Sequence, residues 1–283
     1  MKTIIYLSSP KRRFGFCLSL FLLLNLLVSS SKVRADYADV NGIRMYFEVH
    51  GQGPPLVLLH GGFGSTQDWT PYLAELGKKF RLILIDQEAH GRTSNRGGPL
   101  RYEQMVEDTH ALLMKLKLTQ VSLYGYSDGG IVALAFALKY PTMVKQIAVL
   151  GINAQSLEIA CDTATYQRII NLPDDFDFPG GSDRYRKTAY DPDHWPELVK
   201  KLRALYRSFE GWSGDELSQL KVPLLILHGD RDGIQAEHAV WIYRHTPNAS
   251  LTILPNCDHI PSSEDHRKII DHLFDFFEND HSH

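Results

Sequence analysis

Residues 121–130, Val-Ser-Leu-Tyr-Gly-Tyr-Ser-Asp-Gly-Gly, are the stretch that decides the fold. The apolar run 121–124 leads into a Gly-x-Ser-x-Gly pattern centred on Ser127, and the largely apolar run 131–140 follows it. A strand, a tight turn and a helix in this order are typical of a nucleophile elbow, whose strained turn exposes a serine hydroxyl. We therefore predict Ser127 as a nucleophile. The alternative interpretation is a glycine-rich turn with an incidental serine.

Short apolar runs recur on both sides of this stretch, and each is nearly continuous, as expected of strands that are buried on both faces. In chain order they are 56–59, 82–85, 121–124, 147–150, 224–227 and 251–254. Helical spacing of apolar residues occurs at 104–116, 131–140 and 268–277. Near the start, Asn41-Gly42 between two alternating runs predicts a hairpin. Strands that alternate with helices predict an α/β fold with a mostly parallel sheet flanked by helices.

One interval lacks a convincing strand: about 70 residues separate Leu150 from Leu224. A structureless loop of that length is unusual in a compact domain, so we predict a helical cap of about residues 154–221, inserted late in the α/β core. The aromatic residues of this interval are Tyr166, Phe176, Phe178, Tyr185, Tyr190, Trp195, Tyr206, Phe209 and Trp212. They predict an apolar acyl or ring pocket, or else the small core of the cap itself.

A serine hydroxyl needs a general base, and the base needs an acid that orients it. Catalytic groups in open α/β sheets gather at the carboxyl ends of strands. His259 follows the last apolar run, in Cys-Asp-His-Ile-Pro at 257–261, and is the best candidate for the base. Its competitor is His228, which lies at the end of a strand, where a structural role is more common.

The acid has two candidates within His-Gly-Asp-Arg-Asp at 228–232. Asp232 lies two residues beyond Asp230, far enough from the strand to turn back towards His259. Asp230 is better placed to order the turn through backbone hydrogen bonds. The residues therefore favour Asp232, and the chain order Ser127, Asp232, His259 is the one expected of this fold class.

A tetrahedral intermediate needs two preorganised hydrogen-bond donors for its oxyanion. One is expected to be the backbone N–H of Asp128, the residue after the nucleophile. The other is expected from His-Gly-Gly-Phe-Gly at 60–64, which follows an apolar run. Gly62 is favoured as this donor, and its neighbour Phe63 stays an alternative. A third interpretation is a turn that needs glycine only for its backbone.

Together these motifs resemble the α/β-hydrolase superfamily over about residues 37–278. The segment Asp-Gln-Glu-Ala-His-Gly-Arg-Thr-Ser at 86–94 resembles a structural loop of the same family, so His90 is given no chemistry. Two departures from the usual pattern are Cys-Asp before His259 and Gln-Glu-Ala at 87–89. Neither removes a reacting group.

The resemblance implies that Ser127 is the nucleophile, Asp232 the acid and His259 the base of an acyl transfer that requires neither a metal nor an organic cofactor. The first expectation is an exported serine hydrolase that cleaves a carboxylic ester of a small molecule through an acyl-enzyme. A lactonase, a carbon–carbon bond hydrolase, an aminopeptidase and a cofactor-free perhydrolase are alternatives that use the same triad. A non-catalytic binding protein on a hydrolase scaffold is an alternative of another class.

The first 35 residues differ in charge from the rest. They carry six basic side chains and no Asp or Glu, whereas the remainder carries 24 basic and 33 acidic side chains, a formal net charge of −9. A basic stretch at 11–13, an apolar run at 14–28 and small residues up to Ala35 are the parts of a signal peptide. We predict cleavage after Ala35 and a secreted or periplasmic protein that starts near Asp36. An uncleaved N-terminal membrane anchor is the alternative.

The mature chain, residues 36–283, is too acidic to present an electrostatic footprint for nucleic acid or for anionic membranes. The resemblance implies a small-molecule ester or a related acyl substrate as the partner. We expect no nucleic acid as a partner and no integral membrane association after cleavage. Export also bears on Cys161 and Cys257, which either form a disulfide or stay two separate buried thiols. Asn248 begins an Asn-x-Ser sequon, which matters in a eukaryotic host.

Overall fold

The computed structural model describes residues 34–178 and 180–279. The predicted signal peptide therefore lies outside the described residues, apart from Arg34 and Ala35, and its cleavage stays a prediction. These two residues begin the first strand of the sheet and pair with the second. Within the described ranges, no helix is both long enough and apolar enough to cross a lipid bilayer.

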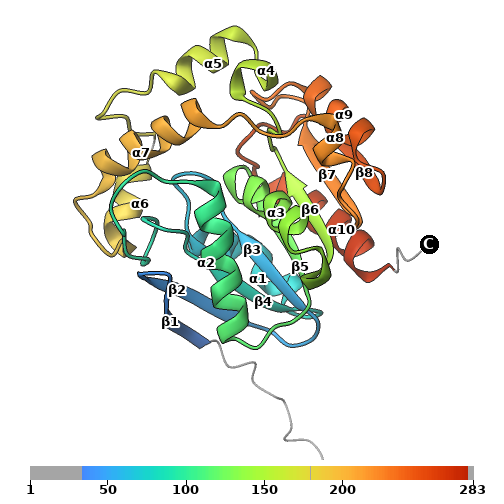
Figure 1. Ribbon diagram of the computed structural model, residues 1–283, viewed down its shortest axis with the longest axis horizontal. Helices are drawn as coiled ribbons and strands as arrows, with labels where there is room; N and C mark the ends of the chain where they lie inside the picture. The colour runs from blue at the N-terminus through green and yellow to red at the C-terminus, as the bar shows by residue number, and fades with distance from the viewer. Residues whose placement is uncertain (1–33, 179, 280–283) are drawn as a thin grey trace, which may run out of the picture. The chain divides into compact units, whose positions relative to one another are not determined.

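A single eight-stranded sheet forms the centre of the described chain (Figure 1). Its strands are β1 (Arg34–Val40), β2 (Ile43–His50), β3 (Pro55–Leu59), β4 (Arg81–Ile85), β5 (Val121–Tyr126), β6 (Val144–Leu150), β7 (Leu224–Gly229) and β8 (Ala249–Leu254). Their order is β1-β2-β4-β3-β5-β6-β7-β8. Strands β3 to β8 are parallel to one another, whereas β2 pairs antiparallel with both β1 and β4. The predicted α/β fold with a mostly parallel sheet is confirmed.

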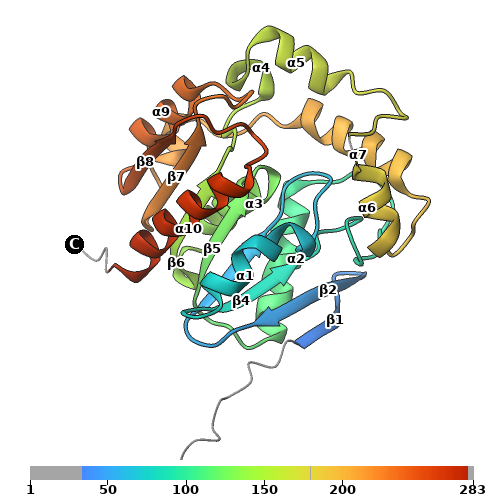
Figure 2. The ribbon, with the colours of Figure 1, turned by 180° about the vertical axis from the view of Figure 1, so that it is seen from behind.

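Helices cover both faces of this sheet, as the two opposite views show (Figures 1 and 2). The covering helices are η1 (Thr66–Trp69), α1 (Thr70–Leu76), α2 (Tyr102–Lys115), α3 (Asp128–Lys139), η2 (Pro141–Met143), α9 (Ala236–His245) and α10 (Ser263–Glu278). Side chains of β3 alternate between the two layers. Val57 and Leu59 pack with residues of α2, α3 and α9, whereas Leu56 and Leu58 pack with residues of α1 and α10. All four side chains are fully buried, as expected of a strand covered on both sides.

Among the described residues, five helices lie between β6 and β7, where the sequence predicts an insertion. They are α4 (Leu157–Ala160), α5 (Thr163–Ile170), α6 (Gly181–Thr188), α7 (Trp195–Ser208) and α8 (Gly214–Leu217). Figure 1 shows α4 to α7 gathered beyond one end of the sheet. Helix α7 buries Leu198, Val199, Leu202 and Leu205, whose spacing is that of an amphipathic helix with one apolar face. The segment is helical, as predicted, in the part of it that the structure describes.

The two cysteines of the predicted mature chain are separate. Cys161 and Cys257 are both buried and both free. Cys161 packs with the side chains of α4, whereas Cys257 belongs to the core layer beneath α1 and α10. Of the two alternatives left by the sequence, the structure has two buried thiols.

Candidate active site

The predicted nucleophile elbow is the turn between β5 and α3. Ser127 has φ 52° and ψ −123°, a backbone conformation that costs a non-glycine residue on the order of 1–3 kcal/mol. Its backbone N–H donates to the carbonyl of Leu150 at 2.9 Å, which holds the strained residue against the neighbouring strand. The flanking glycines are required by space, because a Cβ at Gly125 would lie 2.3 Å from the oxygen of Gly129. A Cβ at Gly129 would lie 2.0 Å from the carbonyl oxygen of Leu59.

The three residues predicted as nucleophile, base and acid meet in one hydrogen-bonded chain. His259 Nδ1 lies 2.9 Å from each carboxylate oxygen of Asp232 and donates to it. Its other nitrogen, Nε2, is therefore unprotonated in the neutral ring and lies 3.1 Å from Ser127 Oγ, from which it accepts. Asp232 is almost completely buried and also accepts the backbone N–H of Ile234 at 2.8 Å.

The two competing candidates have structural contacts instead. Asp230 accepts the backbone N–H of Cys257 at 3.3 Å, which orders the turn, as expected. His228 is buried, and its Nε2 donates to the carbonyl of Ile234 at 2.9 Å. Neither of these two hydrogen bonds involves Ser127.

The electrostatics of the group favour a charged Asp232 and a basic His259. Burial opposes ionisation of Asp232, but the hydrogen bond and charge of His259 outweigh it and lower the pKa of the carboxyl. For His259, burial acts to lower the pKa, whereas the hydrogen bond and charge of Asp232, together with the charge of Asp128, raise it above the ordinary value. The net result is an imidazole that accepts a proton more readily than a free one.

Loop 60–64 packs directly against the elbow. A Cβ at Gly61 would lie 3.0 Å from Ser127 Cβ, and a Cβ at Gly62 would lie 2.7 Å from a carboxylate oxygen of Asp128. Asp128 is the first residue of α3, so its backbone N–H has no partner within the helix. The two segments expected to supply oxyanion donors are therefore in contact. Phe63 has φ 60°, and its ring packs against aromatic residues of the inserted segment.

Asp128 also presents its side chain to the site. Oδ1 accepts from the hydroxyl of Tyr102 on α2 at 3.0 Å, and Oδ2 accepts from the hydroxyl of Tyr206 on α7 at 3.1 Å. Enclosure away from bulk water raises the pKa of this carboxyl to about 6, against the two tyrosine hydrogen bonds, which lower it. Sequence reasoning missed Tyr102, and it included Tyr206 only among the aromatic residues of the inserted segment, because no motif marks a tyrosine that approaches from another helix.

Tyr126, the residue before the nucleophile, is a second contact that the sequence did not reveal. Its hydroxyl donates to the backbone carbonyl of His259 at 2.8 Å, and the two rings lie 5.5 Å apart. In the motif this position is the free "x" of Gly-x-Ser, so the pattern gives it no role. The structure makes it a direct link between the elbow and the histidine loop.

Ser127, Asp232 and His259 line a cavity of about 890 Å³. Its walls are mostly apolar, and the inserted segment supplies Leu157, Ile169, Leu172, Phe176, Phe178, Tyr206 and Phe209. Other aromatics of that segment, such as Tyr185 and Trp195, are buried behind this lining, and Tyr190 is exposed. Some of these aromatic residues thus line an apolar cavity, and others form part of the core of the inserted segment. That the cavity holds an acyl group or a ring stays a prediction.

Comparison with known proteins shows the family. Residues 54–186 match a family described as alpha/beta hydrolase fold. Serine hydrolase BPHL of Homo sapiens is 31% identical over 247 residues, which cover 82% of this chain and 80% of the human protein. The chain belongs to the α/β-hydrolase superfamily.

This α/β hydrolase is also similar to a pimeloyl-[acyl-carrier protein] methyl ester esterase of Nitrosomonas europaea. The two are 27% identical over 246 residues, 77% of this chain and 93% of that one. Among solved structures, naproxen esterase (carboxylesterase NP) from Bacillus subtilis matches 88% of this chain and 92% of its own, with a TM-score of 0.69 and 20% identity. At that identity the structural likeness shows the fold alone, whereas the names of the sequence relatives are those of hydrolases and esterases.

Proposed function

We propose that this α/β hydrolase cleaves carboxylic esters of small molecules through an acyl-enzyme on Ser127. The observation that carries the proposal is the chain of contacts at 3.1 Å and 2.9 Å from Ser127 through His259 to Asp232, exposed in the wall of a largely apolar cavity. A serine with an oriented base and a buried acid is the arrangement that acyl transfer needs.

The proposed reaction follows from these positions. Ser127 Oγ attacks the ester carbonyl while His259 Nε2 takes its proton, and Asp232 stabilises the imidazolium. The backbone N–H groups of Gly62 and Asp128 hold the oxyanion. His259 then gives its proton to the leaving alcohol. A water molecule, deprotonated by the same imidazole, hydrolyses the acyl-enzyme and restores Ser127.

The size and lining of the cavity support a small or medium substrate. A volume of about 890 Å³ lies within the range of about 300–1,000 Å³ that is usual for small-molecule sites. The naming of sequence relatives as a serine hydrolase and as methyl ester esterases supports the same chemistry.

A serine-directed fluorophosphonate probe tests the nucleophile. We expect stoichiometric labelling at Ser127, detected by intact mass, and loss of labelling in S127A and H259A. S250A, which changes an exposed serine, is the matched control and should label like the wild type. Absence of labelling in the wild type would instead support the non-catalytic binding protein.

A substrate panel tests the bond that is cleaved. We expect hydrolysis of 4-nitrophenyl esters, with a dependence on acyl chain length set by the cavity. Lactones, aminoacyl amides and a β-diketone in the same assay represent the alternatives that share the triad. Turnover confined to one of these other classes would overturn the proposed ester preference.

A second candidate, esters of amino acids, is favoured by the carboxylate of Asp128. This group faces the cavity beside the nucleophile, and each oxygen keeps an acceptor site beyond its tyrosine bond. The α-amino group of an aminoacyl ester is two bonds from the attacked carbonyl carbon, so it would lie near the residue next to Ser127. The matched substrates are the methyl esters of phenylalanine and of 3-phenylpropionate. A preference for the former that disappears in D128N would support this candidate, and equal rates in the wild type would contradict it.

We also propose that the protein is exported and cleaved after Ala35. The N-terminal charge, apolar run and small residues support this, and Asp36–Val40 would remain as the edge strand. The N-terminal sequence of the protein recovered from the medium or periplasm tests the proposal. An intact Met1 in a membrane fraction would support the anchor instead.

A further inference from the structure

The inserted segment places an arginine of α5, Arg168, in the wall of the cavity that contains Ser127. Its guanidinium borders Gly233, because a Cβ built at that glycine would lie 3.9 Å from Nη2 of Arg168. Gly233 directly follows Asp232, which is hydrogen-bonded to His259. The charged end of Arg168 therefore reaches from α5 to the turn that carries one of the reacting groups.

Backbone contacts hold the start of α5 against the same turn. The backbone N–H of Gln235 donates to the carbonyl of Ala160 at 2.9 Å. Next to this bond, Cys161 and Ile234 form an antiparallel β-bridge. The position of Arg168 relative to the turn is thus set by main-chain hydrogen bonds and not only by the packing of its own side chain.

The guanidinium of Arg168 is not neutralised by an ion pair. Among residues 34–178 and 180–279, no carboxylate lies within ion-pair distance of it. Asp162 is the N-cap of α5 and accepts two backbone N–H groups at 2.9 and 3.0 Å. Hydrogen bonds from Thr165 lower the pKa of Asp162 most, and the charge of Arg168 lowers it least. The carboxylate of Asp232 faces His259.

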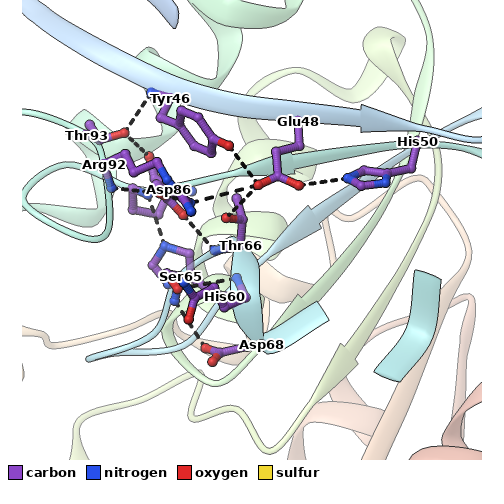
Figure 3. Close-up of polar contacts among 12 residues, drawn as sticks. Tyr46, Glu48, His50, His60, Ser65, Thr66, Asp68, Asp86, Arg92 and Thr93 are labelled. Atoms are coloured by element: carbon purple, nitrogen blue, oxygen red, sulfur yellow. Dashed lines mark hydrogen bonds and ion pairs between the residues drawn. The ribbon is translucent and has the colours of Figure 1, made fainter. Parts of the chain in front are cut away.

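A second arginine of the cavity wall, Arg184 on α6, differs in this respect. Its Nη1 lies 3.5 Å from Asp68 Oδ1. The other oxygen of this carboxylate accepts the backbone N–H of Ser65 at 3.1 Å, which fixes it in place (Figure 3). The guanidinium of Arg184 also lies over the ring of Phe178, 5.7 Å from its centroid. Arg184 therefore has a carboxylate partner within the protein, whereas Arg168 is open to a carboxylate of the substrate.

The cavity thus presents opposite charges at two positions. Asp128 presents its carboxylate beside the nucleophile, and Arg168 presents its guanidinium on α5. A substrate carboxylate next to the attacked carbonyl would be repelled by Asp128, so its favourable position lies further along the substrate chain. The same inserted segment lines the cavity with Leu157, Ile169 and Leu172, whose apolar side chains suit the methylene groups of such a chain.

We propose that Arg168 binds a carboxylate at the far end of the acyl group, so that the preferred substrates are half-esters of dicarboxylic acids. A guanidinium and a carboxylate form paired, charge-assisted hydrogen bonds that a neutral group cannot reproduce. The inference rests on the proposed ester hydrolysis and deepens it by naming the class of acyl group.

Matched esters measure the preference for charge. Monomethyl adipate ends in a carboxylate, and methyl adipamate has a neutral carboxamide of nearly the same size in its place. The corresponding pairs from glutarate to suberate vary the distance between the ester and the charge. At the best length we expect the wild-type kcat/KM to favour the charged member by about 3- to 30-fold, the range for a charged hydrogen bond at a partly exposed site.

Substitutions assign this preference to one arginine. The preference is a ratio of two kcat/KM values for the same variant, so a general loss of activity cancels. In R168Q the ratio should fall to within about twofold of unity, and R168K, which keeps the charge but not the planar fork, should lie between R168Q and the wild type. R184Q should keep the wild-type ratio. R267Q, at an exposed position of α10, is the control for loss of an arginine outside the cavity.

Equal kcat/KM values for the two members at every length would overturn the inference, as would a preference that survives in R168Q. Loss of the preference in R184Q alone would overturn it in favour of Arg184. The compound 6-acetoxyhexanoate carries its carboxylate on the alcohol side of the ester and should show no advantage over its amide. An advantage that R168Q removes would overturn the placement of the carboxylate on the acyl group.

Binding to S127A separates this inference from the proposed function. Calorimetry with S127A compares the affinities for the same ester pairs without turnover, and the difference should disappear in S127A/R168Q. If the wild type hydrolyses no ester but S127A binds the charged members more tightly through Arg168, the proposed reaction fails and the carboxylate site stands. If esters are hydrolysed and neither kcat/KM nor affinity depends on the charge, the site fails and the proposed reaction stands.

Discussion

At the scale of single residues, the proposed reaction depends on the protonation of His259. The imidazole must be neutral to take the proton of Ser127, and its contact with Asp232 raises its pKa. We therefore expect kcat/KM to fall as the pH is lowered through this raised pKa, so that the acid limb lies above the ordinary histidine value of about 6.5. The pH of this acid limb therefore depends on the charges around the His259 imidazole.

Asp128 is one of those charges, and it can be removed without touching the triad. The charge of Asp128 acts to raise the pKa of His259. In D128N the acid limb of kcat/KM should therefore shift to lower pH. The measurement is a pH–rate profile with a 4-nitrophenyl ester. D215N, at an exposed position in α8, is the control with the same change of charge. An unshifted limb in D128N would show that Asp128 does not act on His259.

Tyr126 provides a second test at this scale. Y126F removes the hydroxyl that donates to the carbonyl of His259 at 2.8 Å and leaves the ring in place. Loss of one such hydrogen bond corresponds to about a 3- to 10-fold effect, expected in kcat rather than KM because the bond holds the base and not the substrate. Steady-state kinetics of Y126F measure it. Y190F, at an exposed tyrosine, should match the wild type, and a pure KM effect in Y126F would place the tyrosine in substrate binding instead.

At the scale of elements, the sequence predicts what a local pattern determines. The strands were predictable because a parallel sheet buries both faces and so leaves continuous apolar runs. The boundaries of elements were less predictable than their existence. Helix α10 begins at Ser263, five residues before the predicted residue 268, because Ser262 and Asp265 form a capping box. Helices α1 and α9 were not predicted. Helix α1 buries only Tyr72 and Leu76, too few residues to establish a helical period.

Helix α7 allows a stability test of the inserted segment. Leu202 on this helix is completely buried in the large core cluster. L202A should lower the free energy of unfolding by about 2–5 kcal/mol, because it leaves a cavity in packed surroundings. I159A, on the exposed side of α4, should change it by less than about 0.5 kcal/mol. Denaturant titration measures both, and a neutral L202A would mean that α7 does not share the core.

At the scale of the whole molecule, the reacting groups of the site could be predicted and its surroundings could not. Ser127, Asp232 and His259 each follow a strand within a motif, so their meeting at one edge follows from the topology. Tyr102 and Tyr206 reach Asp128 from α2 and α7. Their approach depends on how helices distant in sequence pack, which no local pattern encodes.

The buried histidines predict how stability responds to acid. Burial lowers the pKa of His60 and His238 to about 4 and that of His90 to about 3. Below about pH 6.5 the unfolded chain binds protons at these histidines that the folded chain does not, so stability falls as the pH drops towards 4. Burial also lowers the pKa of His194, His228 and His266. Four aspartates whose pKa burial raises act in the opposite sense but are fewer than these six histidines: Asp68, Asp86, Asp108 and Asp128.

The expected slope corresponds to a net uptake on the order of one proton on unfolding near pH 5. Denaturant titrations at pH 6.5, 5.5 and 4.5 measure it. H90N should reduce the slope, because one buried histidine no longer contributes. Stability that rises on acidification over this interval would contradict the assignment of these histidines as neutral in the folded state.

The cavity is lined by residues from two different parts of the sequence. Its reacting groups come from the ends of β5, β7 and β8, whereas much of its apolar lining comes from the segment between β6 and β7. Mutations in that segment can therefore alter which molecule is held without altering which bond is attacked. During evolution, substrate selectivity can therefore change while the reacting residues stay the same. In protein engineering, the inserted helices can be exchanged to change the substrate.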